Sequence, residues 1–294
     1  MTAISESPAG ISASPIVRAR NGKPKFHIRP VYFLVAAWLV GVLGPYIWMF
    51  ITSITPPSEL ATSSILPQSP TLSAFPNLLM GTPFLQYLGN SVFVAVGTAL
   101  VTIPCSLLAG TALSRYRFRG RRVVLAGVLL LQLFPSILLI VPLYIELKTI
   151  GLIDSKIGLI LVDSAFAMSF STWLMKGFVD QIPLEIEEAA YIDGCSKLQA
   201  FVYVILPLAR PGIIAAGTYA FIYSWNEFLF ALTFSFSDAT RTMPVGLSLF
   251  IGENFIRWEF LTAGGVLAAI PILIGFMYAQ KGLVAGLASG AVKG

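Results

Sequence analysis

Six long apolar segments constrain this chain more than any other feature of its sequence. Each approaches the 20 or so residues that an α-helix needs to cross the hydrocarbon core of a bilayer. Their apolar residues form continuous runs and do not alternate with polar ones, so the segments predict membrane helices rather than barrel strands. The segments are Val31–Ile54, Ser91–Ser114, Val123–Ile145, Ile157–Met175, Gly212–Phe234 and Phe260–Gln280.

The composition agrees with a membrane protein and argues against several other classes. Only 11% of the 294 residues are charged and 56% are hydrophobic, whereas a soluble globular domain carries roughly 25% charged residues. Cys105 falls in an apolar segment and Cys195 in a polar one, so the two cysteines predict no disulfide. With the single His27 they form no metal-binding pattern, and we predict no metal site.

The distribution of basic residues predicts the orientation of the chain in the membrane. Cytoplasmic loops of membrane proteins carry an excess of Lys and Arg. With both termini in the cytoplasm, most of the 19 basic residues lie inside, and those left outside are Lys148, Lys156, Arg241 and Arg257. The arginine-rich run 115–122 then anchors two spans at the lipid headgroups. Because this placement accounts for the basic residues, we predict no nucleic-acid partner despite the net charge of +5.

The segment 177–211, which we call the bracket, is predicted to form a cytoplasmic helix–turn–helix. Pro183 suits the first turn of a helix, where its missing N–H costs nothing. Gly194 suits the left-handed residue that ends a helix, and Ser196 suits the N-cap of a second helix that runs to Leu206. Two prolines then kink the chain on its return to the membrane, Pro207 and Pro211.

The bracket also contains a motif that resembles a known family. Glu188-Ala189-Ala190 is followed by Gly194 and, after nine intervening residues, by Val204-x-Leu206-Pro207. This pattern is similar to the "EAA" loop of binding-protein-dependent ABC importer permeases, with Val204 in place of Ile as the one departure. The resemblance implies the type I importer permease fold, an all-α integral membrane protein with six transmembrane helices and a cytoplasmic coupling helix–turn–helix.

In that family the loop docks on a separate ATPase subunit. The resemblance therefore implies a transport subunit rather than an enzyme, with ATP and Mg²⁺ bound by the partner ATPase and no cofactor on this chain. The sequence agrees, because it contains no G-x-x-x-x-G-K-[ST] phosphate loop. The bracket residues implied in coupling are Glu187, Glu188, Ala189, Ala190, Asp193, Gly194, Leu206 and Pro207. The implied partners are a second related permease, two ATPase copies, an extracytoplasmic solute-binding protein and membrane lipid.

Further segments resemble the carbohydrate-uptake branch of the family. Ser53–Leu60 partly matches an external motif of sugar permeases, with Thr55 where that motif has Lys. Trp225-Asn226-Glu227-Phe228 is similar to the "WNEF" signature of the same branch. The implied substrate is an oligosaccharide or a disaccharide such as maltose or trehalose, and a glycerol-phosphate compound is the alternative. The outer loop 235–259 is implied to meet the solute-binding protein.

The end of the chain resembles the tail of maltose-permease G-type subunits, which enters the ATPase dimer interface. By this resemblance Gly290, Lys293 and Gly294 contact the ATPase. The expected organisation is a disordered basic tail at 1–30, a six-span permease domain at 31–281 and a cytoplasmic C-terminal tail at 282–294. The protein is expected in the inner or plasma membrane, with multiple spans and both termini in the cytoplasm.

Polar residues within the predicted spans are candidates for the substrate pathway. Two of them are acidic, Asp163 in the fourth span and Glu227 in the fifth. For both, pathway lining and a hydrogen bond between helices are open alternatives. On a continuous helix, Tyr223 and Glu227 share a face while Trp225 points elsewhere. The pathway candidates are Tyr223, Trp225, Asn226, Glu227 and Asp163.

Two other classes remain as alternatives to an ATP-driven importer. An intramembrane enzyme would use Asp163 and Glu227 as a carboxylate pair, but this interpretation leaves the motif from Glu188 to Pro207 unexplained. An ion-coupled secondary transporter would show an internal repeat with broken helices in matched positions. Prolines in several spans predict breaks, but no half-to-half repeat is evident; these prolines are Pro45, Pro104, Pro135 and Pro271.

Overall fold

The computed structural model of the chain describes residues 30–60, 66–252 and 255–291. These residues are mostly helical, and their only β-pairing is an isolated bridge between Ile251 and Ile256. The chain divides into two compact units, Met1–Gly44 and Pro45–Gly294. Helix α1 (Pro30–Ser53) begins in the first unit and ends in the second. The elements and contacts described below belong to the second unit.

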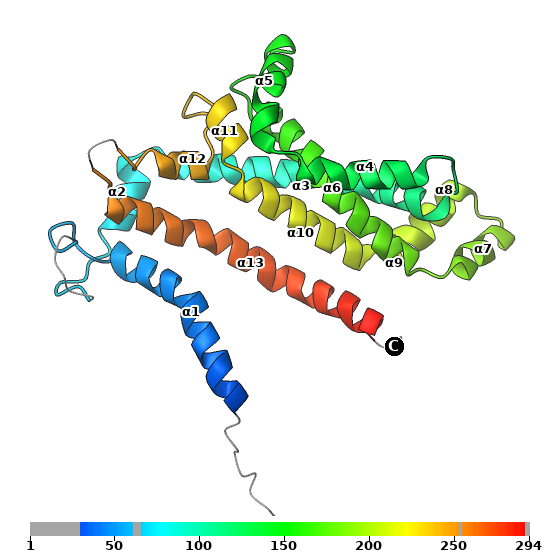
Figure 1. The fold of residues 1–294 in the computed structure, drawn as a ribbon, viewed down its shortest axis with the longest axis horizontal. Helices are drawn as coiled ribbons and strands as arrows, with labels where there is room; N and C mark the ends of the chain where they lie inside the picture. Colours follow the sequence, from blue (N-terminus) through cyan, green and yellow to red (C-terminus); the bar gives the residue numbers. More distant parts are fainter. Residues whose placement is uncertain (1–29, 61–65, 253–254, 292–294) are drawn as a thin grey trace, which may run out of the picture. The chain divides into compact units, whose positions relative to one another are not determined.

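Four long helices form the body of this unit. Helix α3 packs along α6 and α10, and α10 also packs against α13 (Figure 1). Glycines allow the close approach of α3 to α6, since a Cβ added at Gly110 would lie 2.8 Å from the backbone nitrogen of Lys176. Small residues at helix contacts are typical of membrane bundles. The four helices are α3 (Phe84–Arg115), α6 (Lys156–Asp180), α10 (Arg210–Asn226) and α13 (Trp258–Ala291).

Short helices lie at the two ends of this bundle (Figure 1). At one end, which we call the bracket end, are α7 (Leu184–Ile192), α8 (Lys197–Ala200), the π-helical turn η2 (Phe201–Ile205) and α9 (Leu206–Leu208). At the opposite end are α2 (Ala74–Gly81), α11 (Leu229–Phe234) and α12 (Met243–Ser248). The remaining elements are α4 (Arg121–Leu133), the 3₁₀ turn η1 (Ser136–Leu139) and α5 (Ile140–Thr149).

Among the described residues, 4 helices are long and apolar enough to cross a membrane, and the number reaches 6 when each of two bent helix pairs is taken as one span. The chain is therefore a multi-pass membrane protein. The predicted third span is bent by 97° between Arg121–Leu133 and Ser136–Thr149. Pro135 lies at this bend, whereas the breaks predicted at Pro45, Pro104 and Pro271 are wrong because α1, α3 and α13 continue through them.

At the end opposite the bracket, Asp154 joins the turn between α5 and α6 to the segment that follows α11. The Asp154 carboxylate accepts hydrogen bonds from the backbone N–H groups of Phe236 (2.8 Å) and Ser237 (3.1 Å) and from the Thr240 hydroxyl. Burial opposes ionisation, but the bonds from Thr240 and the two amides outweigh it and lower the pKa of Asp154 to about 2. Asp154 has a φ of 53°, which Asp adopts more readily than most residues.

We expect Asp154→Ala to lower the thermal unfolding midpoint of the purified protein in detergent by about 2–4 °C. A loss of about 1 kcal/mol in unfolding free energy produces a shift of this size in a chain of this length. Asp154→Gly relieves the positive φ but still removes the carboxylate, and so isolates the hydrogen bonds. Because the pKa is lowered, the stabilisation is present above about pH 4 and is lost as the pH falls towards 2. An unchanged midpoint in both variants would contradict this role.

Candidate functional site

The first helix of the bracket, α7, ends as its sequence predicts and begins one residue later, since Pro183 precedes its first turn. Pro183 is its N-cap, and the first turn carries Glu185 and Glu187. Gly194 has a φ of +89°, and the N–H of Cys195 donates to the carbonyl of Ala190 at 2.9 Å. This is a Schellman ending, in which the left-handed glycine lets the next N–H groups satisfy the last carbonyls of the helix.

The second helical stretch of the bracket starts at a capping box. The Ser196 hydroxyl accepts from the Gln199 N–H at 3.3 Å, and the Ser196 N–H donates to Gln199 Oε1 at 2.8 Å. Residues 197–208 are helical throughout, with a π turn in which the Leu206 N–H donates to the Phe201 carbonyl. The chain then bends by 73° into α10, as predicted from the two prolines.

A buried ion pair joins the bracket to α3. Arg115, the last residue of α3, donates through Nε to the Glu187 carboxylate and through Nη2 to the Ile182 carbonyl at 2.9 Å. The side chains of Arg115 and Glu187 are only 13% and 3% exposed. Glu187 therefore points into the molecule, and the sequence offered both partners without indicating which arginine of the run 115–122 would meet it.

The outward surface of the bracket combines acidic and apolar side chains. Ile192 is 86% exposed, Leu198 72% and Tyr203 70%. Exposed apolar side chains next to charged ones are typical of a surface that meets another protein. The predicted coupling residues that lie on this surface are Glu188, Ala189, Asp193 and Gly194, while Ala190, Leu206 and Pro207 are half-buried.

Asp163 lies in a chain of hydroxyl hydrogen bonds that crosses three helices. Its Oδ2 accepts from the Ser224 hydroxyl of α10 at 2.5 Å, and the Ser224 hydroxyl accepts from Thr98 of α3 at 3.3 Å. Asp163 is 2% exposed, and its Oδ1 has no hydrogen-bond partner in the described part of the chain. Of the two alternatives left by the sequence, this geometry favours a bond between helices.

Glu227 stands at a helix break, not within a continuous span. Helix α10 ends at Asn226, and Glu227 has extended backbone angles (φ −65°, ψ 127°). Its carboxylate accepts from the N–H of Phe230 at 2.7 Å and of Ala231 at 2.9 Å, in the first turn of α11. The expected helical face shared by Tyr223 and Glu227 is therefore wrong, because the helix ends before Glu227.

The other residues of the Trp-Asn-Glu cluster point to different places. Trp225 is 1% exposed and stacks on Phe221 with ring centroids 5.6 Å apart, so it packs inside the bundle. Asn226 is exposed and donates to the Ile222 carbonyl at 2.8 Å. Tyr223 is half-buried beside Tyr219, 6.3 Å between centroids. Of the five pathway candidates, only Asn226 is exposed.

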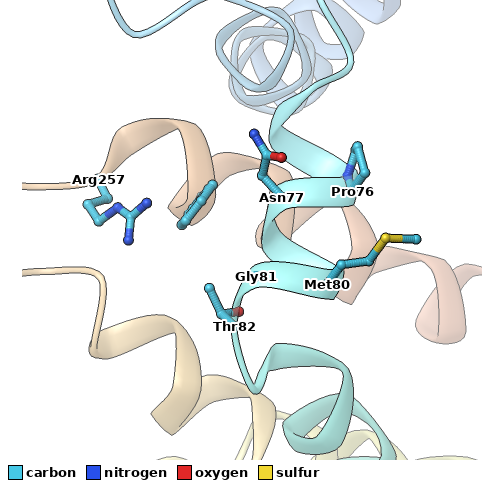
Figure 2. Close-up of a pocket in the computed structure, with 7 residues that line it drawn as sticks. Pro76, Asn77, Met80, Gly81, Thr82 and Arg257 are labelled. Carbon is cyan, nitrogen blue, oxygen red and sulfur yellow. The ribbon is translucent and has the colours of Figure 1, made fainter.

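The end opposite the bracket contains an open cavity of about 550 Å³ between α2 and the start of α13. Figure 2 shows the side chains of Arg257 and Asn77 around it. Phe260, Met80 and Thr82 complete most of its lining. This cavity was not singled out from the sequence, since α2 and Arg257 lie far apart in the chain.

The predicted tail contact falls mostly beyond the described residues. Helix α13 continues to Ala291, so Gly290 lies in helical backbone. Lys293 and Gly294 lie outside the described residues. Within the described ranges, no group of three or more His, Cys, Asp or Glu residues is arranged to hold a metal ion.

The described residues form a helical bundle with helices long enough to cross a membrane and a capped helix pair at one end. Residues 102–288 match the family described as the binding-protein-dependent transport system inner membrane component. The chain belongs to this family, and the resemblance seen in the sequence is confirmed.

Curated relatives cover nearly the whole chain. The sulfoquinovosyl glycerol transport system permease protein of Agrobacterium fabrum is 35% identical over 272 residues, which are 92% of this chain and 95% of that protein. The trehalose transport system permease protein of Mycobacterium tuberculosis is 34% identical over 90% of this chain and 98% of its own length. The trehalose/maltose permease protein of Thermococcus litoralis is 33% identical, covering 91% and 98%.

A solved structure has the same fold. One chain of a bacterial ABC transporter involved in the import of the acidic polysaccharide alginate superimposes with a TM-score of 0.72 at 26% identity. The match covers 87% of this chain and 98% of that chain. The type I importer permease fold predicted from the sequence is therefore confirmed, and the chain is a transport subunit rather than an enzyme.

We expect Arg115→Gln to destabilise the protein by about 3 kcal/mol, because the buried Glu187 carboxylate loses its charged partner. The double variant Arg115→Gln, Glu187→Gln should lose less than the sum of the two single variants. Chemical unfolding in detergent measures all three. Lys176→Gln is the matched control, since its i,i+4 pair with Asp180 is more exposed and contributes about 0.5 kcal/mol or less. Additive losses would contradict the pairing.

We expect Glu227→Ala to lower stability by about 2 kcal/mol, since two N–H groups of α11 lose their acceptor, and Glu227→Gln to lower it less. Asn226→Ala is the control, because the Asn226 side chain only donates to the Ile222 carbonyl, which belongs to the helix itself, and leaves no N–H group without an acceptor. Thermal unfolding and transport kinetics are both measured. Normal stability in Glu227→Ala with altered substrate preference would favour the pathway interpretation instead.

Proposed function

We propose that this chain is one of two permease subunits of an ATP-driven importer for a carbohydrate, and that it forms half of the translocation pathway. Its relatives' names support this, because they specify trehalose, maltose and a sulfonated sugar glycoside. The Trp-Asn-Glu-Phe segment at 225–228 is a second support, since it resembles the carbohydrate branch. The experiment below identifies the substrate, which is a particular sugar or, as the alternative, a glycerol-phosphate compound.

The observation that carries the coupling proposal is the attachment of the bracket to three helices. The bracket follows α6 in the chain, leads into α10 through the 73° bend, and is fixed to α3 by the Arg115–Glu187 pair. A force applied to its exposed surface is therefore transmitted to α3, α6 and α10 together. The surface around Glu188 and Ala189 would meet the ATPase subunit, which binds ATP and Mg²⁺.

The remaining partners follow from the same proposal. Two ATPase copies act on this chain and on the related second permease, and an extracytoplasmic solute-binding protein delivers the substrate. A solved transporter with this fold, 16% identical to this chain, is a bacterial alginate ABC transporter in complex with an alginate pentasaccharide-bound periplasmic protein. The bracket end is cytoplasmic, as are both termini, and the C-terminal residues Gly290, Lys293 and Gly294 contact the ATPase.

The first experiment measures ATP hydrolysis by the assembled complex in lipid vesicles, with its solute-binding protein, over a panel of sugars and sugar phosphates. We expect one compound to stimulate hydrolysis, which identifies an importer and its substrate together. We expect Glu188→Lys to lose most of this stimulation, because it reverses a charge on the exposed bracket surface.

Asp193→Lys reverses a charge one residue beyond the end of α7 and serves as a positional comparison, with complex assembly checked by size-exclusion chromatography. Full stimulation in Glu188→Lys would contradict the coupling role of that residue. If an intact complex responds to no compound of the panel, the carbohydrate assignment is wrong. Uptake driven by an ion gradient without ATP would favour the secondary transporter.

A further inference from the structure

The cavity between α2 and α13 is organised around one arginine. Arg257 precedes the first residue of α13, and its N–H donates to the Phe250 carbonyl at 3.0 Å. Its own carbonyl accepts from the Leu261 N–H at 2.9 Å. The backbone of Arg257 is therefore held from both sides, which fixes where its side chain starts.

The guanidinium group is also held, by an aromatic ring. The central carbon of the guanidinium lies 3.9 Å from the centroid of the Phe260 ring, and Phe260 is itself only 6% exposed. Stacking on a ring occupies the flat face of a guanidinium and leaves its N–H edge available for hydrogen bonds. The side chain is thus positioned before any partner arrives, which lowers the entropic cost of binding.

Within the part of the chain that the structure describes, the charge of Arg257 is only weakly compensated. Among the described residues its one ion pair is with Glu259, at 3.5 Å from Nε, which is the outer limit of a hydrogen bond, and its side chain stays 44% exposed. Other basic residues of this end are engaged more closely. Arg241 donates to Asp238 at 2.8 Å, and Lys156 donates to Asn90 at 3.3 Å.

The rest of the lining suits a protein partner. Met80 is 88% exposed, and Pro76 and Asn77 are also exposed on α2. Arg, Met and aromatic residues are enriched in protein–protein interfaces, and Arg is frequent among the residues that dominate their binding energy. A guanidinium with a free edge matches the two oxygens of a carboxylate.

We propose that this cavity receives an Asp or Glu side chain of the solute-binding protein, with Arg257 as the charged contact and Asn77 and Met80 as its neighbours. The proposal rests on the proposed function, because it requires that this end face the binding protein. It adds the residue that makes the contact and the chemistry of the group that it accepts. Phe260 acts through Arg257, by holding the guanidinium in place.

The test measures ATP hydrolysis by the complex in vesicles as the concentration of substrate-loaded binding protein is increased. We expect Arg257→Glu to raise the half-saturating concentration by about tenfold or more, with Arg257→Lys in between. Added salt should weaken the wild-type interaction more than that of Arg257→Glu. The matched control is Lys148→Glu, which reverses an exposed charge near the same end of the bundle but outside the cavity.

The alternatives give different outcomes. Equal half-saturation in Arg257→Glu and wild type overturns the proposal, as does an equal increase in Lys148→Glu, which would indicate net charge alone. A defect seen only in vesicles with anionic lipid would assign the cavity to a lipid headgroup, and a defect seen only with anionic substrates would assign it to the substrate. If the wild-type complex is not stimulated by any binding protein, the proposed function itself fails.

Discussion

The ion pair between Arg115 and Glu187 attaches the bracket directly to the end of α3. Through the chain alone, the bracket is attached to α6 and α10, and two such connections leave it free to swing about the line that joins them. Arg115 adds a third attachment, and its bond to the Ile182 carbonyl places that attachment next to the start of α7. Because Glu187 is buried and Arg115 is largely buried, water and salt compete less for this pair than for a surface pair. Together with the apolar packing of Ile182 and Ile205 against Leu107 and Met175, this pair links the bracket to the helices.

The helix break at Glu227 is subject to a different constraint, because an unpaired backbone group within a membrane costs free energy. Irregular backbone within a membrane persists only where other groups satisfy its N–H and C=O groups. Glu227 satisfies two N–H groups of α11, and its own N–H donates to the Ser224 carbonyl at 3.2 Å. The Ser224 hydroxyl in turn bonds to Asp163 and Thr98. The two acidic residues of the predicted spans thus both stabilise the end of α10. Asp163 accepts from Ser224 within its last turn, and Glu227 follows its last residue and accepts from α11.

Local signals in the sequence were sufficient for the bracket because each acts within a few residues. A proline before a helix, a glycine after it and a Ser–Gln capping box depend on neighbouring backbone groups only. Gly194 and Ser196 lie where predicted, and Pro183 is the N-cap, one position before the predicted first turn. The direction of Glu187 and the burial of Trp225 depend on helices distant in sequence, and the sequence gives no means of choosing among them. The break after Asn226 was missed because Glu227 looks like an ordinary helical residue unless the short helix that it caps is known. The contact roles of these residues with other proteins stay predictions.

Helix α3 connects the two ends of the molecule within a single element. Its 32 residues correspond to about 48 Å at the rise of an α-helix. Near its start, the Tyr87 hydroxyl donates to Asp238 at 2.5 Å, and Asn90 donates to the Arg241 carbonyl at 2.9 Å. At its end, Arg115 holds the bracket. A ligand or partner at one end shifts the conformation only if it binds one state more tightly than another. Since α3 is fastened to the loops at one end and to the bracket at the other, a displacement of the bracket that moves α3 as a rigid body necessarily displaces the loop that carries Asp238 and Arg241.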